Sequence, residues 1–328
     1  MGMKRDASQD NHRALILFNP QAGSGDAPAA AAIAERHLCE AGWTVESLET
    51  IGPEVRDSKS EATRLEGARQ ASMVLIAGGD GTLREVIADL LSLDCRPPIA
   101  IIPTGNANVL AREYAIPLDP KAAAQLAITG GRIAVDCGVA NEQLFLAMAG
   151  VGYDAIAVCW LHRLRASGIG RFVYRLRGGA DFLYTLVGFA ALFRLAPVRV
   201  SASTNERGKV GGLATVAVLN TAQYAKNWSV APDACAHDGM LNTRFERGAL
   251  FLRPLIALWM TARRRLAPPC VARYGRVREL SIEGQRPFAW QLDGEPMPPA
   301  ISLRISLVPA FFDLVVPATI QPSSAHVL

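Results

Sequence analysis

Gly78-Gly79-Asp80-Gly81-Thr82 stands between the apolar run Met73–Ala77 and a helical pattern that starts near Leu83. Glycine lets a backbone approach a ligand closely and adopt positive φ angles, and the exposed N–H groups at the start of a helix favour phosphate. Asp80 adds a carboxylate suited to a hydrated Mg²⁺, and Thr82 adds a hydroxyl. The string therefore predicts a phosphate-binding turn from a strand into a helix.

Two other turns of small residues occupy equivalent places. Asn19–Gly25 follows the apolar run Ala14–Phe18, and Pro103–Asn108 follows Ile99–Ile102 and leads into a helical pattern. Ligands of parallel sheets bind outside the carboxyl ends of the strands, so we expect the three turns to line one nucleotide cleft. Neither GxxxxGK[ST] nor GxGxxG is present, which argues against an ordinary P-loop or dinucleotide site.

The two halves of the chain differ in their predicted pattern of helices and strands. The first half alternates strands with helices, which indicates a parallel sheet covered on both faces; the helices are expected at 28–41, 60–71, 83–91 and 109–114, and the strands at 14–18, 44–48, 73–77 and 99–102. The second half is typical of an antiparallel β-rich domain, with strands expected at 132–139, 144–149, 198–204, 213–219, 241–246, 277–282 and 301–307 and helical insertions at 171–195 and 250–266.

These patterns predict four parts: a polar tail (1–12), a nucleotide-binding α/β domain (13–135), a β-rich acceptor domain (136–308) and a last segment (309–328) that returns to the first domain. Of the 328 residues, 50% are hydrophobic and 20% are charged, which excludes a disordered or collagen-like chain. The start is no signal peptide, and Phe182–Leu195 is too short to span a bilayer. Six scattered Cys without a CxxC pair indicate a reducing cytosol.

Asp293-Gly294-Glu295 follows the strand-like run Phe288–Leu292. Phosphoryl transfer to an alcohol needs a base for the hydroxyl proton, and two carboxylates flanking a glycine can serve that step. The alternative is an ordinary exposed turn, because Asp-Gly is a common hairpin signal.

Taken together, the motifs resemble the diacylglycerol kinase catalytic family, the lipid kinases related to sphingosine and ceramide kinases. The matching motifs occur in order: Asn19-Pro20 with Gly23, Gly78–Thr82 with Glu85-Val86, Pro103–Asn108 with Ala111-Arg112, Asp238-Gly239, and Asp293–Glu295. The resemblance implies a Rossmann-like N-terminal α/β domain and a C-terminal antiparallel β-sandwich, and an ATP- and Mg²⁺-dependent kinase of diacylglycerol or a related lipid.

The resemblance also implies the site. The expected nucleotide contacts are Asn19, Pro20, Gln21, Ala22, Gly23, Thr50, Gly78, Gly79, Asp80, Gly81, Thr82, Leu83, Arg84, Asn106 and Asn108. Arg84 stands where relatives usually carry Asn, and Asn106 where they often carry Thr. An arginine can still meet a phosphate, and an asparagine can still form a hydrogen bond.

Three acidic residues carry the expected chemistry: Glu295 as general base, Asp293 as its alternative or metal-linked partner, and Asp80 near the phosphates. A structural Mg²⁺ is implied at Asp238, joined by the main-chain carbonyls of Cys235 and Met240. Oxygen ligands suit such a hard cation.

Clusters of arginine beside aromatic residues (Arg163 to Arg177, and Arg263 to Arg265) suit an anionic membrane surface. We therefore expect a cytoplasmic protein that meets its lipid substrate at the inner face of the membrane and has no nucleic-acid partner, and a homodimer stays open. An NAD kinase shares Gly-Gly-Asp-Gly-Thr and is one alternative. A nucleotide-binding regulatory protein without catalysis is another, motivated by Arg84 and Asn106.

Overall fold

The computed structural model describes residues 12–20, 25–50, 64, 66–92, 96–167, 187, 200–204, 208–225, 228–229, 231, 233–247 and 272–320. The chain divides into two units. The first combines Met1–Ala134 with Phe312–Leu328, and the second is Val135–Phe311. The expected helical insertions at 171–195 and 250–266 lie outside the described residues, apart from the helical residue Val187.

A parallel sheet forms the centre of the first unit, with strands in the order β2-β1-β3-β4 and the end of β16 beside β4. Its strands are β1 (Arg13–Phe18), β2 (Thr44–Glu49), β3 (Met73–Gly78) and β4 (Ile99–Pro103). Every residue of β3 and β4 is buried. Continuous apolar runs of this kind are expected where both faces of a parallel sheet are covered.

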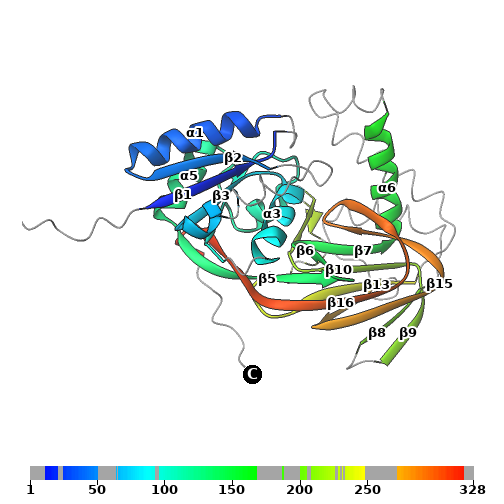
Figure 1. The fold of residues 1–328 in the computed structure, drawn as a ribbon. Coiled ribbons are helices and arrows are strands. Elements are labelled where there is room, and N and C mark those ends of the chain that lie inside the picture. Colours follow the sequence, from blue (N-terminus) through cyan, green and yellow to red (C-terminus); the bar gives the residue numbers. More distant parts are fainter. Residues whose placement is uncertain are drawn as a thin grey trace, which may run out of the picture. The chain divides into compact units, whose positions relative to one another are not determined.

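Helices cover the two faces of this sheet. On one face, small side chains of α1 (Ala27–Glu40) and α5 (Pro120–Thr129) form a core with Ile16, Leu75 and Ile102, and the two helices lie side by side (Figure 1). Successive side chains of a strand point to opposite faces, so Ile76 and Ile101 face the other way and meet α3 (Asp80–Ser92) near Leu83. Helix α5 was not predicted, although Asp119 caps its Ala122 N–H and Pro120 follows directly.

Helix α3 starts earlier than we predicted, at Asp80 instead of near Leu83. Only Gly79 separates it from β3. The glycines suggested a longer turn, but a carboxylate in the first turn favours the positive end of a helix dipole. Asp80, Gly81 and Thr82 consequently belong to the first turn of the helix.

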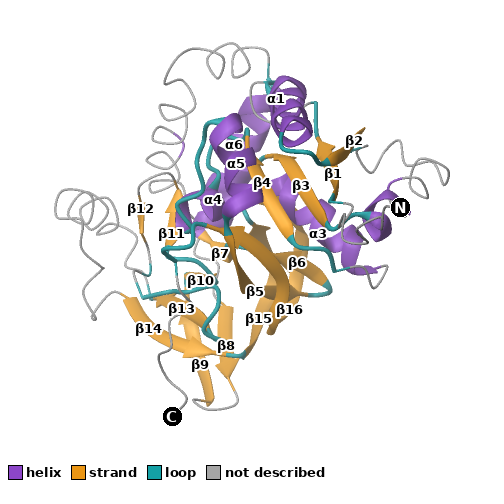
Figure 2. Cartoon of the chain, turned by 90° about the vertical axis from the view of Figure 1, so that its left-hand side faces the viewer, coloured by secondary structure: helices purple, strands orange, loops and turns teal. Residues whose placement is uncertain are grey.

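The second unit is an antiparallel sheet in the order β14-β13-β10-β7-β15-β16. Its elements are β5 (Gly131–Ala140), β6 (Gln143–Phe145), β7 (Met148–Gly152), α6 (Tyr153–Ala166), β8 (Val200–Thr204), β9 (Gly208–Leu213), β10 (Thr215–Leu219), β13 (Leu241–Glu246), β14 (Ala272–Val277), β15 (Glu279–Leu292) and β16 (Glu295–Val316), with β11 (Gln223–Ala225) and β12 (Trp228–Ser229) as a separate pair. Figure 2 shows how strongly strands dominate it. The predicted fold class, parallel α/β followed by antiparallel β, is confirmed.

Several elements of the second unit differ from the predictions. The strand expected at 144–149 is split into β6 and β7, and the one at 213–219 is split at Ala214. The strand expected at 277–282 begins on the last residue of β14, Val277, and continues into the start of the 14-residue β15, and the one at 301–307 is the middle of the 22-residue β16. Helix α6 was not predicted, because it follows β7 without a polar linker.

None of the helices in the described part of the chain is both long and apolar enough to cross a membrane.

Candidate active site: glycine turns and an Asp-Gly-Glu hairpin

The turns at the carboxyl ends of the parallel strands are joined to one another. The Asn19 amide after β1 donates to the Thr82 hydroxyl of α3 at 3.2 Å, and the Thr104 N–H after β4 donates to the Gly78 carbonyl at 3.0 Å. At the end of β2, the Thr50 N–H donates to the Phe18 carbonyl at 2.8 Å. The structure thus brings together on one rim the residues that the sequence placed at separate strand ends.

The glycines of this rim have two different surroundings. A Cβ on Gly105 would lie 2.5 Å from the Gly79 Cα, and one on Gly78 would lie 2.6 Å from the Thr82 Cβ. These glycines let the chain pack against itself. A Cβ on Gly81 would meet no atom of the described residues within 4 Å, so among the three glycines of the Gly78–Thr82 string this one borders open space in the described part of the chain.

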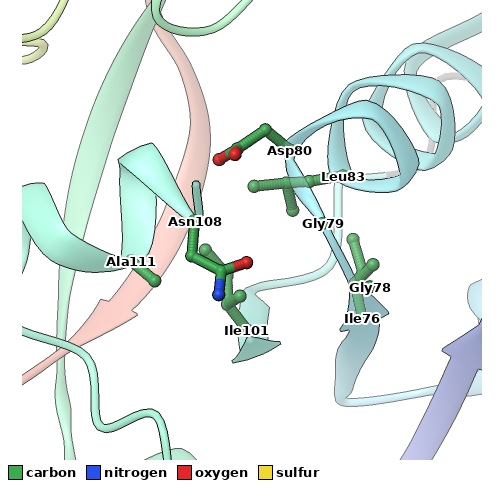
Figure 3. A pocket seen from close by; sticks show the side chains of 8 residues that line it. All are labelled: Ile76, Gly78, Gly79, Asp80, Leu83, Ile101, Asn108 and Ala111. Carbon is green, nitrogen blue, oxygen red and sulfur yellow. The ribbon is translucent and has the colours of Figure 1, made fainter. Parts of the chain in front are cut away.

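Asp80 links two of the turns. Its Oδ1 accepts the N–H groups of Val109 at 2.7 Å and of Leu110 at 3.4 Å, at the start of α4 (Val109–Glu113). Figure 3 shows its carboxylate directed toward that helix. A carboxylate that accepts the first N–H groups of a helix acts as its cap, so Asp80 fixes the Pro103–Asn108 turn as well as adding negative charge.

Among the other predicted nucleotide contacts, Asn108 has a structural task. It adopts φ 47°, and its buried side chain accepts the Gly105 N–H at 2.9 Å and donates to the Gly105 carbonyl at 2.7 Å. Asn106 is exposed, Arg84 is half-buried and Leu83 is buried. Pro20 is half-buried beside Asn19, and Gln21, Ala22 and Gly23 lie outside the described residues.

A small pocket opens among these turns (Figure 3). It is lined by Ile76, Gly78, Gly79, Asp80, Leu83, Ile101, Asn108 and Ala111. Thr104 directly follows β4, and its buried hydroxyl has no hydrogen-bond partner among the residues that the structure describes. A buried polar group without a partner is costly. The N–H groups in the first turn of a helix such as α3 favour an anion such as phosphate.

In the second unit, Asp293-Gly294 is a two-residue hairpin loop between β15 and β16, with Leu292 paired to Glu295. Both loop residues have positive φ, 49° at Asp293 and 86° at Gly294, as a type I′ turn requires. The hairpin alternative was therefore correct for the first two residues, and Glu295 is the first residue of the following strand.

Asp293 itself is used by the backbone. Its Oδ2 accepts the Leu146 N–H at 2.8 Å, and its Oδ1 accepts those of Ala147 at 2.8 Å and Met148 at 2.9 Å. These bonds hold the gap between β6 and β7, which explains why the strand expected at 144–149 is interrupted. A carboxylate with three N–H donors is strongly stabilised as an anion and is a poor choice for a general base.

Glu295 has the opposite character. Its side chain is 47% exposed, and within the described part of the chain its Oε2 lies 3.9 Å from the Nδ1 of His162 in α6. An accessible carboxylate can accept a proton from a bound alcohol. Of the two carboxylates in the trio, the geometry favours Glu295.

Cys137 lies close to this hairpin but offers no nucleophile. Burial raises the pKa of its thiol, and the carboxylates of Asp293 and Asp136 raise it further. The reactive form of cysteine is the thiolate, so Cys137 stays inert at neutral pH.

Two buried polar residues of this unit were not predicted to belong to a site. Asp154 in the first turn of α6 is 6% exposed, and Gln291 of β15 is 1% exposed. Their side chains are joined, the Gln291 Nε2 donating to the Asp154 Oδ2 at 2.6 Å. The available signal was an acidic residue two positions after the end of the Gly-containing strand Met148–Gly152, where a carboxylate favours the start of a helix.

At the expected metal site, the carboxylate of Asp238 pairs with an arginine side chain of the protein. Asp238 accepts the Met240 N–H at 3.0 Å with Oδ1, and the Arg276 guanidinium pairs with its Oδ2. Burial raises the pKa of the Asp238 carboxyl, while Arg276 opposes that rise. No group of three or more His, Cys, Asp or Glu side chains suited to a metal occurs in the described part of the chain. The donors do not fit a Mg²⁺ while Arg276 is bound, so we derive no chemical step from a metal at Asp238, Cys235 and Met240.

Removing the guanidinium should reveal whether Arg276 takes the place of a cation. In Arg276→Met we expect Mg²⁺ to raise the melting temperature, because binding to the folded state alone stabilises it by about 2.7 kcal/mol at a hundredfold excess over Kd. We expect wild type and Arg273→Met, which removes an exposed arginine of the same strand, to respond little. Thermal melts with and without Mg²⁺ check this, and an equal rise in wild type would show that the cation binds beside Arg276.

Known proteins resemble both units. The diacylglycerol kinase catalytic domain model matches residues 13–140, and the YegS C-terminal NAD kinase β-sandwich-like domain model matches residues 148–316. A diacylglycerol kinase of Bacillus subtilis (strain 168) is 27% identical over 238 residues, which cover 70% of this chain and 72% of that protein. A protein of Enterobacter sp. (strain 638) named "Probable lipid kinase YegS-like" is 30% identical over 259 residues, 76% of this chain and 81% of its own.

The fold has solved counterparts. A diacylglycerol kinase from Bacillus anthracis str. Sterne superposes with a TM-score of 0.68 at 19% identity, over 94% of this chain and 98% of that one. The matches place the chain in the class of phosphotransferases that use an alcohol group as acceptor. Within that class, it belongs to the diacylglycerol kinase family, together with the YegS-like lipid kinases. The predicted family, fold class and enzyme class are confirmed.

Proposed function

We propose that the protein is an ATP- and Mg²⁺-dependent kinase that transfers a phosphoryl group to the hydroxyl of diacylglycerol or a related neutral lipid. The observation that supports the nucleotide half of this proposal is the rim of the first unit, which carries Gly81, the first turn of α3 and the buried Thr104 hydroxyl, for which the described residues offer no hydrogen-bond partner. The acceptor half rests on the accessible Glu295 and on the lipid-kinase names of the relatives.

The protein's own groups have separate tasks in this proposal. N–H groups at the start of α3 would hold the phosphates, and Asp80 keeps the neighbouring turn in place through Val109. Glu295 would take the proton of the lipid hydroxyl while that oxygen bonds to phosphorus and the bond from phosphorus to the ADP oxygen breaks. Bound ATP would supply the phosphoryl group, and Mg²⁺ would neutralise its charge.

Membrane contact is part of the same proposal, because the acceptor resides in a bilayer. Of the predicted basic clusters, Arg163 and Arg165 lie in the last turn of α6, and Arg163 is exposed. The remaining arginines, 171, 175, 177 and 263–265, lie outside the described residues. Each basic group near an anionic surface contributes about 1 kcal/mol of attraction.

The deciding experiment supplies the purified full-length chain with labelled Mg-ATP and, in separate reactions, a fractionated lipid extract, diacylglycerol vesicles and NAD. We expect label in a phosphorylated neutral lipid and none in NADP, with identification by mass. Label in NADP would favour the NAD kinase alternative. ATP binding without transfer to any lipid would favour the regulatory alternative.

A further inference from the structure

A buried amide connects helix α6 to the hairpin that carries Glu295. Gln291 is 1% exposed and stands on β15, three residues before the loop glycine. Its Nε2 donates to the Asp154 Oδ2 at 2.6 Å, and its Oε1 accepts the Gly294 N–H at 2.7 Å. Gln291 therefore uses both ends of its amide, one toward α6 and one toward the loop.

The opposite strand is built around this pair. Gly150 of β7 is the direct ladder partner of Gln291. A Cβ on Gly150 would lie 2.1 Å from the Asp154 Oδ2 and 2.7 Å from the Gln291 Nε2. Glycine inside a strand weakens it and often marks a close approach of another group, and here the space of the missing side chain is filled by the two hydrogen-bonded side chains.

The hairpin loop is thus held on both sides. Asp293 is bound through its carboxylate to the N–H groups of residues 146–148, and Gly294 is bound through its N–H to Gln291. Glu295 is the next residue along the chain, at the first position of β16. Any shift of Gly294 would move the Glu295 backbone with it.

We infer that Gln291 is a positioning residue, which fixes through Gly294 the place of the Glu295 carboxylate. This inference rests on the proposed function, in which Glu295 is the general base. Gln291 touches none of the reacting groups. The Gln291 amide donates one hydrogen bond and accepts another. A methionine or an ionised glutamate at this position could not do both.

The test compares Gln291→Met and Gln291→Glu with wild type in the full-length chain, using lipid phosphorylation, ATP titration and thermal melting. We expect Gln291→Met to lower kcat by about 10- to 100-fold, because small misplacements of catalytic groups have effects of this size, while ATP affinity stays within about twofold, as is typical for a site that is not touched. Gln143→Met is the matched control, since Gln143 is exposed on β6 of the same unit. It should behave as wild type.

Gln291→Glu adds a readout that loss of packing alone does not give. Ionised, the new side chain would face the Asp154 carboxylate; protonated, it regains the donor and restores the native bonds. Among the described residues, the hairpin beside Gln291 carries Asp293 and Glu295, His162 of α6 lies within ion-pair distance of Glu295, and Cys137 of β5 lies within electrostatic reach of Asp293 and Asp136. We expect the activity of Gln291→Glu, relative to wild type at each pH, to rise as the pH falls.

Wild-type kcat in Gln291→Met would overturn the inference. Should that variant not fold, a flat pH ratio for Gln291→Glu would overturn it, and a ratio that rises with acid would support it. Glu295→Gln separates this inference from the proposed function. An active Glu295→Gln would contradict the role of Glu295 as general base. An inactive Glu295→Gln together with a fully active Gln291→Met would contradict only the positioning role of Gln291.

Discussion

Glu295→Gln is expected to lower kcat for lipid phosphorylation by about a thousandfold, within the range that a general base contributes. The amide keeps the size of the side chain but accepts no proton at neutral pH. Because the nucleotide rim belongs to the other unit, ATP affinity should stay within about twofold of wild type. Single-turnover assays with diacylglycerol vesicles, together with ATP titration, check both halves of this expectation.

Asp293→Asn is the informative comparison for that experiment. Its amide group would present N–H to the Leu146 or Ala147 N–H, so we expect a loss of stability of about 2–3 kcal/mol, the cost of leaving buried partners of a charged group unsatisfied. Glu295 is half-exposed, and its variant should melt as wild type does. Full activity in Glu295→Gln together with a stable, inactive Asp293→Asn would transfer the base to Asp293.

The sequence predicted best the short strands. β13 has the expected bounds, and β1, β3 and β4 differ by one residue. It predicted worst the long strands β15 and β16. Proline normally ends a strand, yet β16 contains Pro296, Pro298, Pro299 and Pro309. Register shifts along the β15–β16 pair accommodate such irregularities, and pairing between distant segments decides where they fall.

The site divides in the same way. Local motifs were sufficient to find the Gly78–Thr82 string and the Asp293–Glu295 trio. The task of Asp293, however, depends on a partner 147 residues away. The task of Gln291 depends on Asp154, 137 residues away. Long-range packing decides that Glu295 is accessible and that Asp293 binds the backbone. The spacing of residues within a motif does not predict such packing.

The two kinds of glycine on the nucleotide rim should respond in opposite ways to a single methyl group. Gly105→Ala places a Cβ 2.5 Å from the Gly79 Cα and 2.8 Å from the Asn108 Oδ1, so backbone has to move. We expect a loss of stability of about 3 kcal/mol, the upper end for overpacking. Gly81→Ala meets no atom of the described residues within 4 Å and replaces glycine within a helix, so it should gain up to about 1 kcal/mol of stability.

The more stable of the two variants, Gly81→Ala, should be the one that loses affinity for ATP. If phosphate lies against the bare Cα of Gly81, the added methyl group occupies its space, and the affinity of the well-folded Gly81→Ala for ATP should fall by about tenfold to a hundredfold, equivalent to 1.4–2.8 kcal/mol. Thermal melts and ATP titration of both variants give the comparison, with the exposed Gly211→Ala of β9 as control. A stable Gly81→Ala that binds ATP as tightly as wild type would mean that the phosphates bind elsewhere, because a phosphate in contact with Gly81 would clash with the added methyl group.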